Sequence, residues 1–325
     1  MRRRTFIATS GGMAIAWPLA AAGQPREKQR VIGVVLSAGP VAAISPPNPI
    51  RPTRAFLRRM RELGWIEGRN LIVERRSADG RPERAAVIFA ELVSAGCEAI
   101  WLGGPEWIFR AALGTTSTVP LVGQFGGDPV AWGLVASLAR PGGNLTGITR
   151  STGIENVRKR LQLLMELAPR TTRIAYLLGT AAQVQDLPPD LAPGGTRLVY
   201  AVGRPDELDE VFALILREGC DAMYDGGHYF VRSRIIAFAA QHRLPAIYGY
   251  REAVEDGGLI SYGPDFVDDN VQAAELFDRI LRGAKPADLP VRQLDRFELL
   301  INRRTAEALG LTITPTLEAR AEVIE

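Results

Sequence analysis

The 325-residue chain has few of the side chains that do most enzymatic chemistry. It contains two histidines, His228 and His242, and two cysteines, Cys97 and Cys220. Their spacing does not fit a zinc site. The sequence also lacks a G-x-S-x-G elbow, a Walker loop and a G-x-G-x-x-G that follows a strand. We therefore predict that the protein is not an enzyme and that it has no catalytic residue, no metal and no cofactor.

After its first two dozen residues the chain has no apolar run long enough to span a bilayer. The beginning is different: three arginines at positions 2–4 precede a short apolar stretch, and residues 20–22 are alanines. This pattern is typical of a secretory signal, and Arg3-Arg4 with Phe6 resembles the twin-arginine signal that exports folded proteins. No cysteine stands at the cleavage site, which argues against a lipid anchor. We predict a signal peptide at 1–22 and a periplasmic mature protein.

The chain also lacks an excess of one charge once that signal is removed. It has 39 Lys and Arg against 36 Asp and Glu, and three of the arginines lie in the predicted signal. The remainder is balanced, so no basic surface for nucleic acid is indicated. We predict no nucleic-acid partner.

What the sequence does contain is an internal repeat. Residues 89–104 match residues 212–227 without a gap, including Gly96-Cys97 against Gly219-Cys220 and a terminal Gly-Gly in both. Each segment is typical of a helix end, a glycine cap, a short apolar strand and a glycine turn. Because both halves alternate short apolar strands with helices, we predict an α/β fold with two doubly wound parallel-sheet lobes. A ligand cleft is expected between them, at the carboxyl ends of the strands.

Crossover strands should divide the chain between the lobes. The strand at 144–149 is expected to lead into the second lobe, and 257–263 to lead back to the first, where an amphipathic helix at 268–281 would pack. The predicted boundaries are 30–149 plus 262–286 for lobe one and 150–261 plus 287–325 for lobe two.

One span of the second half is poor in helix-forming residues. Residues 180–195 contain Pro188, Pro189, Pro193 and a final Gly-Gly pair. Proline and glycine both disfavour a helix interior. We predict that the first helix of lobe two is shortened or lost.

Several stretches resemble the motifs of one bacterial family. They are DPV at 128–130, SLARPGGNLTG at 137–147, RLPAIYG at 243–249, GGLISYGP at 257–264 and FELLIN at 297–302. Together they resemble, over nearly the whole chain, the ABC transporter substrate-binding proteins of the tryptophan/tyrosine-type uptake group, related to branched-chain amino acid binders. The resemblance implies a type I periplasmic-binding-protein fold. It also implies a monomer that captures a small polar molecule, with an amino acid among the candidates, for ABC permease and ATPase subunits of the inner membrane.

The span 180–195 departs from that family, whose members usually have a full helix there. The N-terminus of that helix would face the cleft, where its free N–H groups suit a ligand carboxylate. This departure leaves open a degenerate member with an altered ligand.

The candidate ligand-binding residues stand at strand ends and crossovers that should face the cleft. They are Ser37, Gly104, Asp128, Thr149, Asp225, Tyr248 and Tyr262. A carboxylate can bind a ligand ammonium, although Asp128 before Pro129 is also a typical helix N-cap. The two tyrosines either flank an aromatic or apolar ligand or are buried near the hinge.

Other protein classes use related folds. A transcription regulator would need a helix-turn-helix ahead of lobe one, where this chain has a predicted signal. A ligand-sensing component of a membrane signalling receptor fits nearly as well as a transporter component. An α/β enzyme is the third alternative, and substrate turnover that is lost on changing Asp128 or Asp225 would support it.

Overall fold

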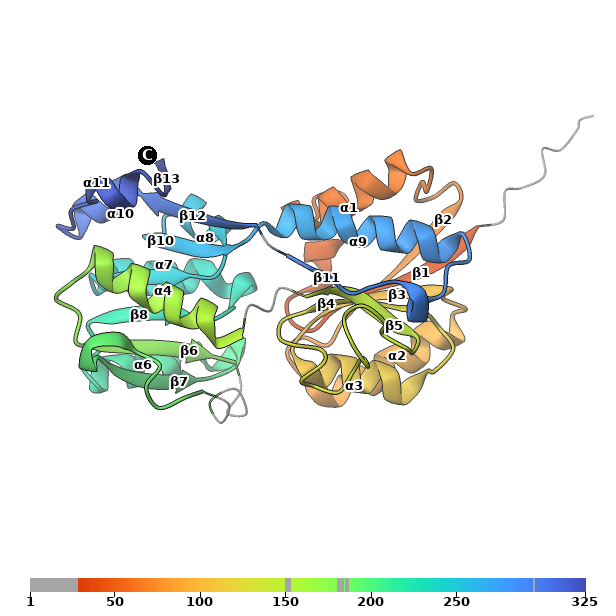
Figure 1. The fold of residues 1–325 in the computed structure, drawn as a ribbon, viewed down its shortest axis with the longest axis horizontal. Helices are drawn as coiled ribbons and strands as arrows, with labels where there is room; N and C mark the ends of the chain where they lie inside the picture. Colours follow the sequence, from red (N-terminus) through yellow and green to blue (C-terminus); the bar gives the residue numbers. More distant parts are fainter. Residues whose placement is uncertain (1–28, 150–152, 180–183, 185–186, 295) are drawn as a thin grey trace, which may run out of the picture.

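The chain folds into two α/β lobes that lie side by side (Figure 1). The computed structural model describes residues 29–149, 153–179, 184, 187–294 and 296–325. The predicted signal at 1–22 lies outside the described residues. Within the described ranges, no helix combines the length and apolar character that crossing a bilayer requires. Each lobe is a sheet with helices on both faces, which confirms the predicted fold class.

The first lobe is built on a six-stranded parallel sheet. Its strands are β1 (Arg30–Leu36), β2 (Leu71–Ser77), β3 (Ala99–Gly104), β4 (Leu121–Phe125), β5 (Leu145–Thr149) and β11 (Arg292–Gln293). They stand in the order β11-β5-β4-β3-β1-β2. Every residue of β4 and β5 is buried, as expected for parallel strands covered on both faces.

Helices cover both faces of this sheet. They are η1 (Val41–Ile44), α1 (Arg51–Glu62), η2 (Pro82–Arg84), α2 (Ala85–Ser94), α3 (Glu106–Thr115), α9 (Phe266–Leu281) and η6 (Pro286–Asp288), with η marking 3-10 turns. On one face α1 packs along α9, and Phe56 of α1 stacks on Trp101 of β3 with ring centroids 4.7 Å apart. On the other face, α2 and α3 bury Phe89 and Phe109.

The second lobe is built on a seven-stranded sheet. Its strands are β6 (Arg173–Leu178), β7 (Arg197–Val202), β8 (Ala222–Asp225), β9 (Ala246–Tyr248), β10 (Ile260–Pro264), β12 (Phe297–Asn302) and β13 (Glu322–Ile324). They stand in the order β13-β12-β10-β9-β8-β6-β7. Strand β12 runs antiparallel to β10, whereas the other described pairs are parallel.

Two layers of helix also cover this sheet. The helices are α4 (Gly153–Leu167), η3 (Pro193–Gly195), η4 (Pro205–Glu207), α6 (Leu208–Arg217), η5 (Tyr229–Val231), α7 (Arg232–Gln241), α8 (Arg251–Glu255), α10 (Arg303–Ala308) and α11 (Pro315–Glu318). One buried cluster joins α6, α7 and α8 to the sheet. A second cluster joins α4, α10 and α11 to its other face.

The span between β6 and β7 is the one for which a shortened helix is predicted. Residues 180–183 and 185–186 lie outside the described residues, so most of that prediction remains untested. Val184 is helical, and the described residues 187–196 contain the three-residue turn η3. Beneath this span, Tyr176 of β6 and Tyr224 of β8 are paired in register, and their rings stack with centroids 4.3 Å apart. In the second lobe the two stacked rings come from neighbouring strands, whereas in the first lobe Phe56 of a helix stacks on Trp101 of a strand.

The chain passes from one lobe to the other after β5, after β10 and after β11. Two of the predicted boundaries differ from the structure. Residues 262–264 complete β10, which pairs with β12 in the second lobe, and β11 pairs with β5, so residues 287–294 belong to the first lobe. A two-residue polar strand at a sheet edge has too few residues to show the period-two pattern that marks a strand in sequence.

Candidate ligand-binding site between the lobes

Loops that follow the carboxyl ends of the parallel strands meet between the lobes. Gly39 follows β1, and a Cβ built on it would lie 2.5 Å from Cδ2 and 2.7 Å from Cδ1 of Phe230, which follows β8. Gly80 follows β2, and its built Cβ would lie 3.8 Å from Cδ of Pro205, which follows β7. Ligands of open α/β sheets bind at these strand ends. This interlobe contact is therefore the candidate site.

Three predicted site residues of the first lobe lie around one another. Gly104 packs so closely on Ser37 that a Cβ at position 104 would overlap the Ser37 hydroxyl. The N–H of Gly126 donates to the carbonyl of Gly104 at 3.1 Å, and the hydroxyl of Thr149 donates to the carbonyl of Gly127 at 3.1 Å. Ser37 is half-buried and Thr149 is buried. Ser37 and Gly104 are partly exposed and form a small-residue surface at the carboxyl ends of β1 and β3, and the buried Thr149 lies at the end of β5.

Asp128 lies next to this surface and is exposed. Its Oδ1 accepts hydrogen bonds from the N–H of Val130 at 2.8 Å and of Ala131 at 3.2 Å. Residues 129–133 form turns. Asp128 therefore caps a turn, and not the helix that the sequence suggested. Contact with a ligand ammonium stays a prediction for this carboxylate.

Asp225 points into the second lobe, where it is 1% exposed. Its Oδ1 lies 2.8 Å from Nδ1 of His228 and accepts from the N–H of Gly227 and His228, and its Oδ2 accepts from the hydroxyl of Tyr250 at 2.7 Å. Burial by itself raises the pKa of the Asp225 carboxyl, but the hydrogen bonds and charge of His228 lower that pKa by more. This burial differs from the prediction that Asp225 faces the ligand. The carboxylate instead holds the loop that presents Phe230.

The two predicted tyrosines also have protein surroundings. Tyr248 is 1% exposed and belongs to the core under α7. Of the two alternatives for this tyrosine, the structure has the buried one. Its burial raises the pKa of its hydroxyl. Tyr262 is half-buried and stacks on Phe297 with ring centroids 5.5 Å apart. Its carbonyl accepts from Nε of Arg160 at 2.6 Å.

An aromatic cluster at the interlobe contact was missed from the sequence. It consists of Tyr229, Phe230, Tyr250 and Phe266. The ring of Tyr229 lies 5.4 Å from Phe230, 5.0 Å from Tyr250 and 5.9 Å from Phe266. Tyr229, Phe230 and Phe266 are half-buried, so part of the cluster remains accessible. The signal was available for two of them, because Tyr229-Phe230 directly follows the Gly-Gly-His turn at the end of β8.

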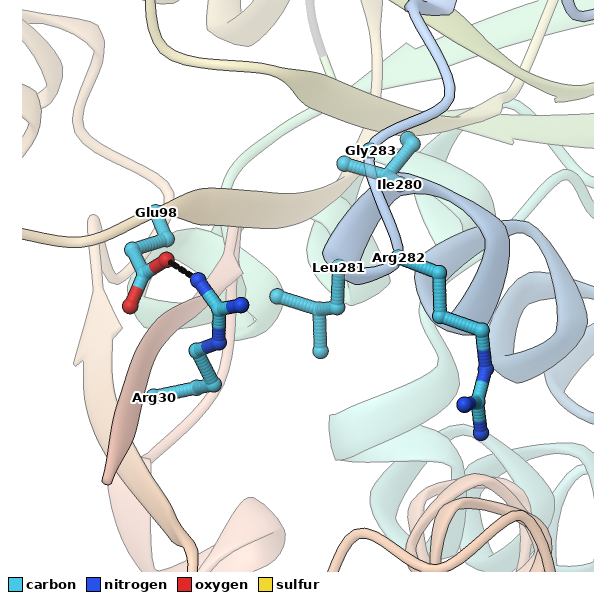
Figure 2. A pocket seen from close by; sticks show the side chains of 6 residues that line it. All are labelled: Arg30, Glu98, Ile280, Leu281, Arg282 and Gly283. Atoms are coloured by element: carbon cyan, nitrogen blue, oxygen red, sulfur yellow. Dashed lines mark hydrogen bonds and ion pairs between the residues drawn. The ribbon is translucent and has the colours of Figure 1, made fainter. Parts of the chain in front are cut away.

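Two pockets lie away from this contact. One, of about 290 Å³, is at the amino ends of β1 and β3, where the ion-paired Arg30 and Glu98 face Leu281 of α9 (Figure 2). Arg282 also lines this pocket, and its guanidinium pairs with Asp278 at 2.7 Å. The other, of about 330 Å³, is lined by residues of the second lobe, including Tyr248 and Arg304. Neither pocket is lined by residues of both lobes.

Comparison with known proteins agrees with this arrangement. Residues 42–324 match the family model described as ABC transporter substrate binding protein. A tyrosine-binding protein of Clostridioides difficile is 25% identical over 296 residues, which are 88% of this chain and 82% of that relative.

Solved structures show the same fold. A conserved domain protein from Vibrio cholerae has 25% identity and a TM-score of 0.78, over 91% of this chain and 99% of that one. A complex with L-Trp from Streptococcus pneumoniae has 20% identity and a TM-score of 0.76, over 91% and 100% of the two chains. Because the family match spans most of the sequence, this chain belongs to the ABC transporter substrate-binding protein family.

Proposed function

We propose that this protein is exported to the periplasm, binds an amino acid with an aromatic side chain between its lobes, and delivers it as a monomer to an ABC importer. The observation that carries the proposal is the half-buried aromatic cluster of Tyr229, Phe230 and Phe266 where the lobes meet. Aromatic rings in such contacts contribute about 0.5–1.5 kcal/mol per pair beyond the area they bury. The cluster therefore favours a planar ligand over an aliphatic one.

The first lobe supplies groups for the polar end of an amino acid. Asp128 is exposed, and its Oδ2 is not used by the turn that Oδ1 caps. A carboxylate suits an ammonium group. Ser37 and Gly104 contact each other, Gly104 accepts a hydrogen bond from Gly126, two residues before Asp128, and no larger side chain fits at position 104. In this proposal Ser37, Gly104 and Asp128 contact the ligand, whereas Asp225 and Tyr248 support the loops that do.

Each lobe then provides part of the site, so the ligand stabilises the arrangement in which the lobes are together. The names of two relatives support the ligand class, since one is a tyrosine-binding protein and another was solved with L-Trp. The family is one of substrate-binding proteins, and we propose that this chain likewise has no enzymatic activity.

The test is ligand-dependent unfolding of the chain from Gly23 onward. The panel is L-tryptophan, L-tyrosine and L-phenylalanine, with L-leucine as an aliphatic control and tyramine as a control without a carboxylate. A ligand at about a thousand times its Kd adds about 4 kcal/mol to stability, which raises the midpoint of a domain-sized protein by several degrees. A shift with an aromatic amino acid that exceeds both controls supports the proposal.

A folded protein that responds to leucine, a sugar or a nucleoside, and to no aromatic amino acid, contradicts the ligand class. Asp128→Asn separates the roles within the site. We expect it to weaken binding of the amino acid while leaving the unfolding midpoint of the free protein nearly unchanged, because an amide oxygen still caps the turn.

A further inference from the structure

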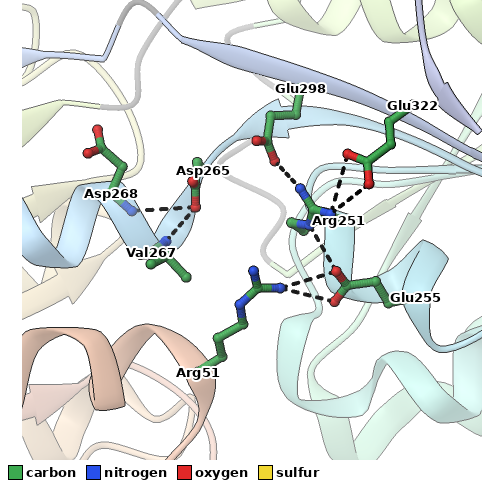
Figure 3. Close-up of polar contacts among 8 residues, drawn as sticks. All are labelled: Arg51, Arg251, Glu255, Asp265, Val267, Asp268, Glu298 and Glu322. Atoms are coloured by element: carbon green, nitrogen blue, oxygen red, sulfur yellow. Dashed lines mark hydrogen bonds and ion pairs between the residues drawn. The ribbon is translucent and has the colours of Figure 1, made fainter. Parts of the chain in front are cut away.

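Two charged residues outside the candidate site join the lobes. We propose that Arg51 and Glu255 are positioning residues for ligand capture, whose ion pair favours the arrangement in which the lobes are in contact. Arg51 begins α1 of the first lobe, and Glu255 ends α8 of the second. Nη1 of Arg51 lies 3.1 Å from Oε1 of Glu255 (Figure 3). The inference rests on the proposed function insofar as it predicts ligand affinity.

The pair lies beside a connection between the lobes. Figure 3 shows it next to the start of α9, where Asp265 accepts hydrogen bonds from the N–H of Val267 and Asp268. This cap fixes the first turn of the helix that leads from the second lobe into the first. A contact at this point is well placed to act on the angle between the lobes.

Glu255 is held in position by its own lobe. Arg251 lies 2.9 Å from Glu255, 2.7 Å from Glu298 and 3.3 Å from Glu322. These carboxylates come from α8, β12 and β13, and the guanidinium between them is only 18% exposed. Because Arg251 already orders Glu255, the Glu255 side chain loses little further freedom when Arg51 approaches.

The same network leaves an excess of negative charge. One guanidinium, that of Arg251, faces three carboxylates, so the second lobe presents a net negative site to the first. Arg51 is the cation that the first lobe brings to it. The like-charged carboxylates repel one another, and the attraction of a second guanidinium to them offsets that repulsion. The charge balance therefore favours lobes that are together over lobes that are apart.

The size of the effect follows from exposure. The side chains of Arg51 and Glu255 are 49% and 34% exposed, and pairs this accessible are weak and screened by salt. Loss of the pair should therefore weaken ligand binding by about two- to five-fold. The difference between wild type and variant should shrink as salt rises from about 50 mM to about 500 mM.

Arg51→Gln is the test variant, and Arg59→Gln is its matched control. Arg59 stands on the same helix and pairs with Glu62 and Glu275 at 3.1 Å each, entirely within the first lobe. Each variant removes the ion pairs of one arginine on α1, but only Arg51→Gln removes a contact between the lobes. We expect a salt-dependent rise in the Kd of the aromatic amino acid for Arg51→Gln, and an unchanged Kd for Arg59→Gln.

A second measurement does not need a ligand. Spin labels on Val87→Cys and Leu216→Cys, which are 60% and 48% exposed on different lobes, report the distance between lobes in the free protein. The native thiols Cys97 and Cys220 are buried, and burial raises the pKa of each to about 11, so they should resist labelling. We expect Arg51→Gln to lengthen or broaden the distance distribution, and Arg59→Gln to leave it unchanged.

The outcomes separate this inference from the proposed function. Distances that are identical in wild type and Arg51→Gln overturn it, even if affinity falls. If no aromatic amino acid binds but the distances respond to Arg51→Gln, the proposed function is wrong and the interlobe pair stands.

Discussion

Gly39→Ala, which adds one methyl group, should hinder the contact between the lobes while both lobes remain folded. Gly39 has φ of +87°, and a Cβ there would overlap the ring of Phe230 on the opposite lobe. The overlapped atoms are Cγ and both Cδ carbons, which stand at the base of the ring. They cannot swing aside as the tip of a long side chain can, so Gly39→Ala can only be accommodated by moving the lobes or the loop that carries Phe230.

Two terms make up the expected effect. An L-residue in the left-handed region costs about 1–2 kcal/mol, and this term acts on the first lobe whether the lobes meet or not. Overpacking of a close contact costs about 1–3 kcal/mol, and this term acts only when the lobes meet. Since about 1.4 kcal/mol corresponds to a tenfold change in Kd, the second term of about 1–3 kcal/mol predicts ligand binding that is about 5- to 140-fold weaker.

Gly64→Ala is the matched control. Gly64 lies in the same lobe with φ of +98°, and nothing lies within 4 Å of its built Cβ. Both variants should therefore lower the midpoint of thermal unfolding by a similar amount. Calorimetric titration with the aromatic amino acid should show a large loss of affinity for Gly39→Ala and little change for Gly64→Ala.

A rescue variant completes the test. Phe230→Ala in the Gly39→Ala background removes the overlap, so binding should return to the level of Phe230→Ala alone. Equal affinity losses in Gly39→Ala and Gly64→Ala would refute the reasoning, because they would mean that the contact between Gly39 and Phe230 is not formed when ligand is bound.

Three further substitutions probe the second lobe. Tyr250→Phe removes the hydroxyl that donates to buried Asp225, and should lower the free energy of unfolding by about 1.5–3 kcal/mol in urea titrations; a loss below 0.5 kcal/mol would contradict the hydrogen bond. Burial lowers the pKa of His228, but the Asp225 carboxylate raises it by more, so this pair stabilises the fold fully below the ordinary histidine pKa of about 6.5 and less as pH rises through the higher folded value. His228→Gln should therefore destabilise the protein more at about pH 6 than at about pH 9 in urea titrations, and an equal loss at both pH values would contradict the charged pair. Arg160→Met removes donors to the hydroxyl of Tyr224 and the carbonyl of Tyr262, and should lower the unfolding midpoint by several degrees in calorimetry.

Much of the fold could be predicted because its signals are local and repeated. Apolar strands, glycine caps and the Gly-Cys repeat each need only a few neighbouring residues. The two lobes and their parallel sheets follow from these signals together with the handedness and layering rules of α/β folds. The edge strand β11 could not be predicted, since two residues carry no periodicity and their pairing with β5 depends on chain far away in sequence.

The site was less predictable, because a position at a strand end does not fix the direction of a side chain. Asp225 and Tyr248 are register partners on neighbouring strands, so both point to the same face of the sheet. That face is covered by α7 and α8, which bury them. A shift of register by one residue would have turned both to the other face. The aromatic cluster draws on Phe266 as well as Tyr229, and only the folded sheet brings the start of α9 to the end of β8.

The two faces of the second sheet also bear on whether the unusual span 180–195 alters ligand binding. Consecutive residues of a strand point to opposite faces, and Tyr224 and Asp225 are consecutive in β8. Tyr224 belongs to the face covered by α4, where its hydroxyl accepts from Nη1 of Arg160 at 2.9 Å. Asp225 belongs to the opposite face, where it holds His228 and Tyr250.

The described residues of the unusual span, among them Val184 and Leu187, pack on the face of Tyr224. The aromatic cluster is built from the other face, through the loop that Asp225 holds. If the helix after β6 is shortened as the sequence predicts, the donors that it loses lie at one face of the sheet, and the aromatic surface at the other face stays in place. This geometry favours a retained aromatic ligand with altered contacts to its carboxylate over a loss of binding, and it is the reason that the ligand panel includes tyramine.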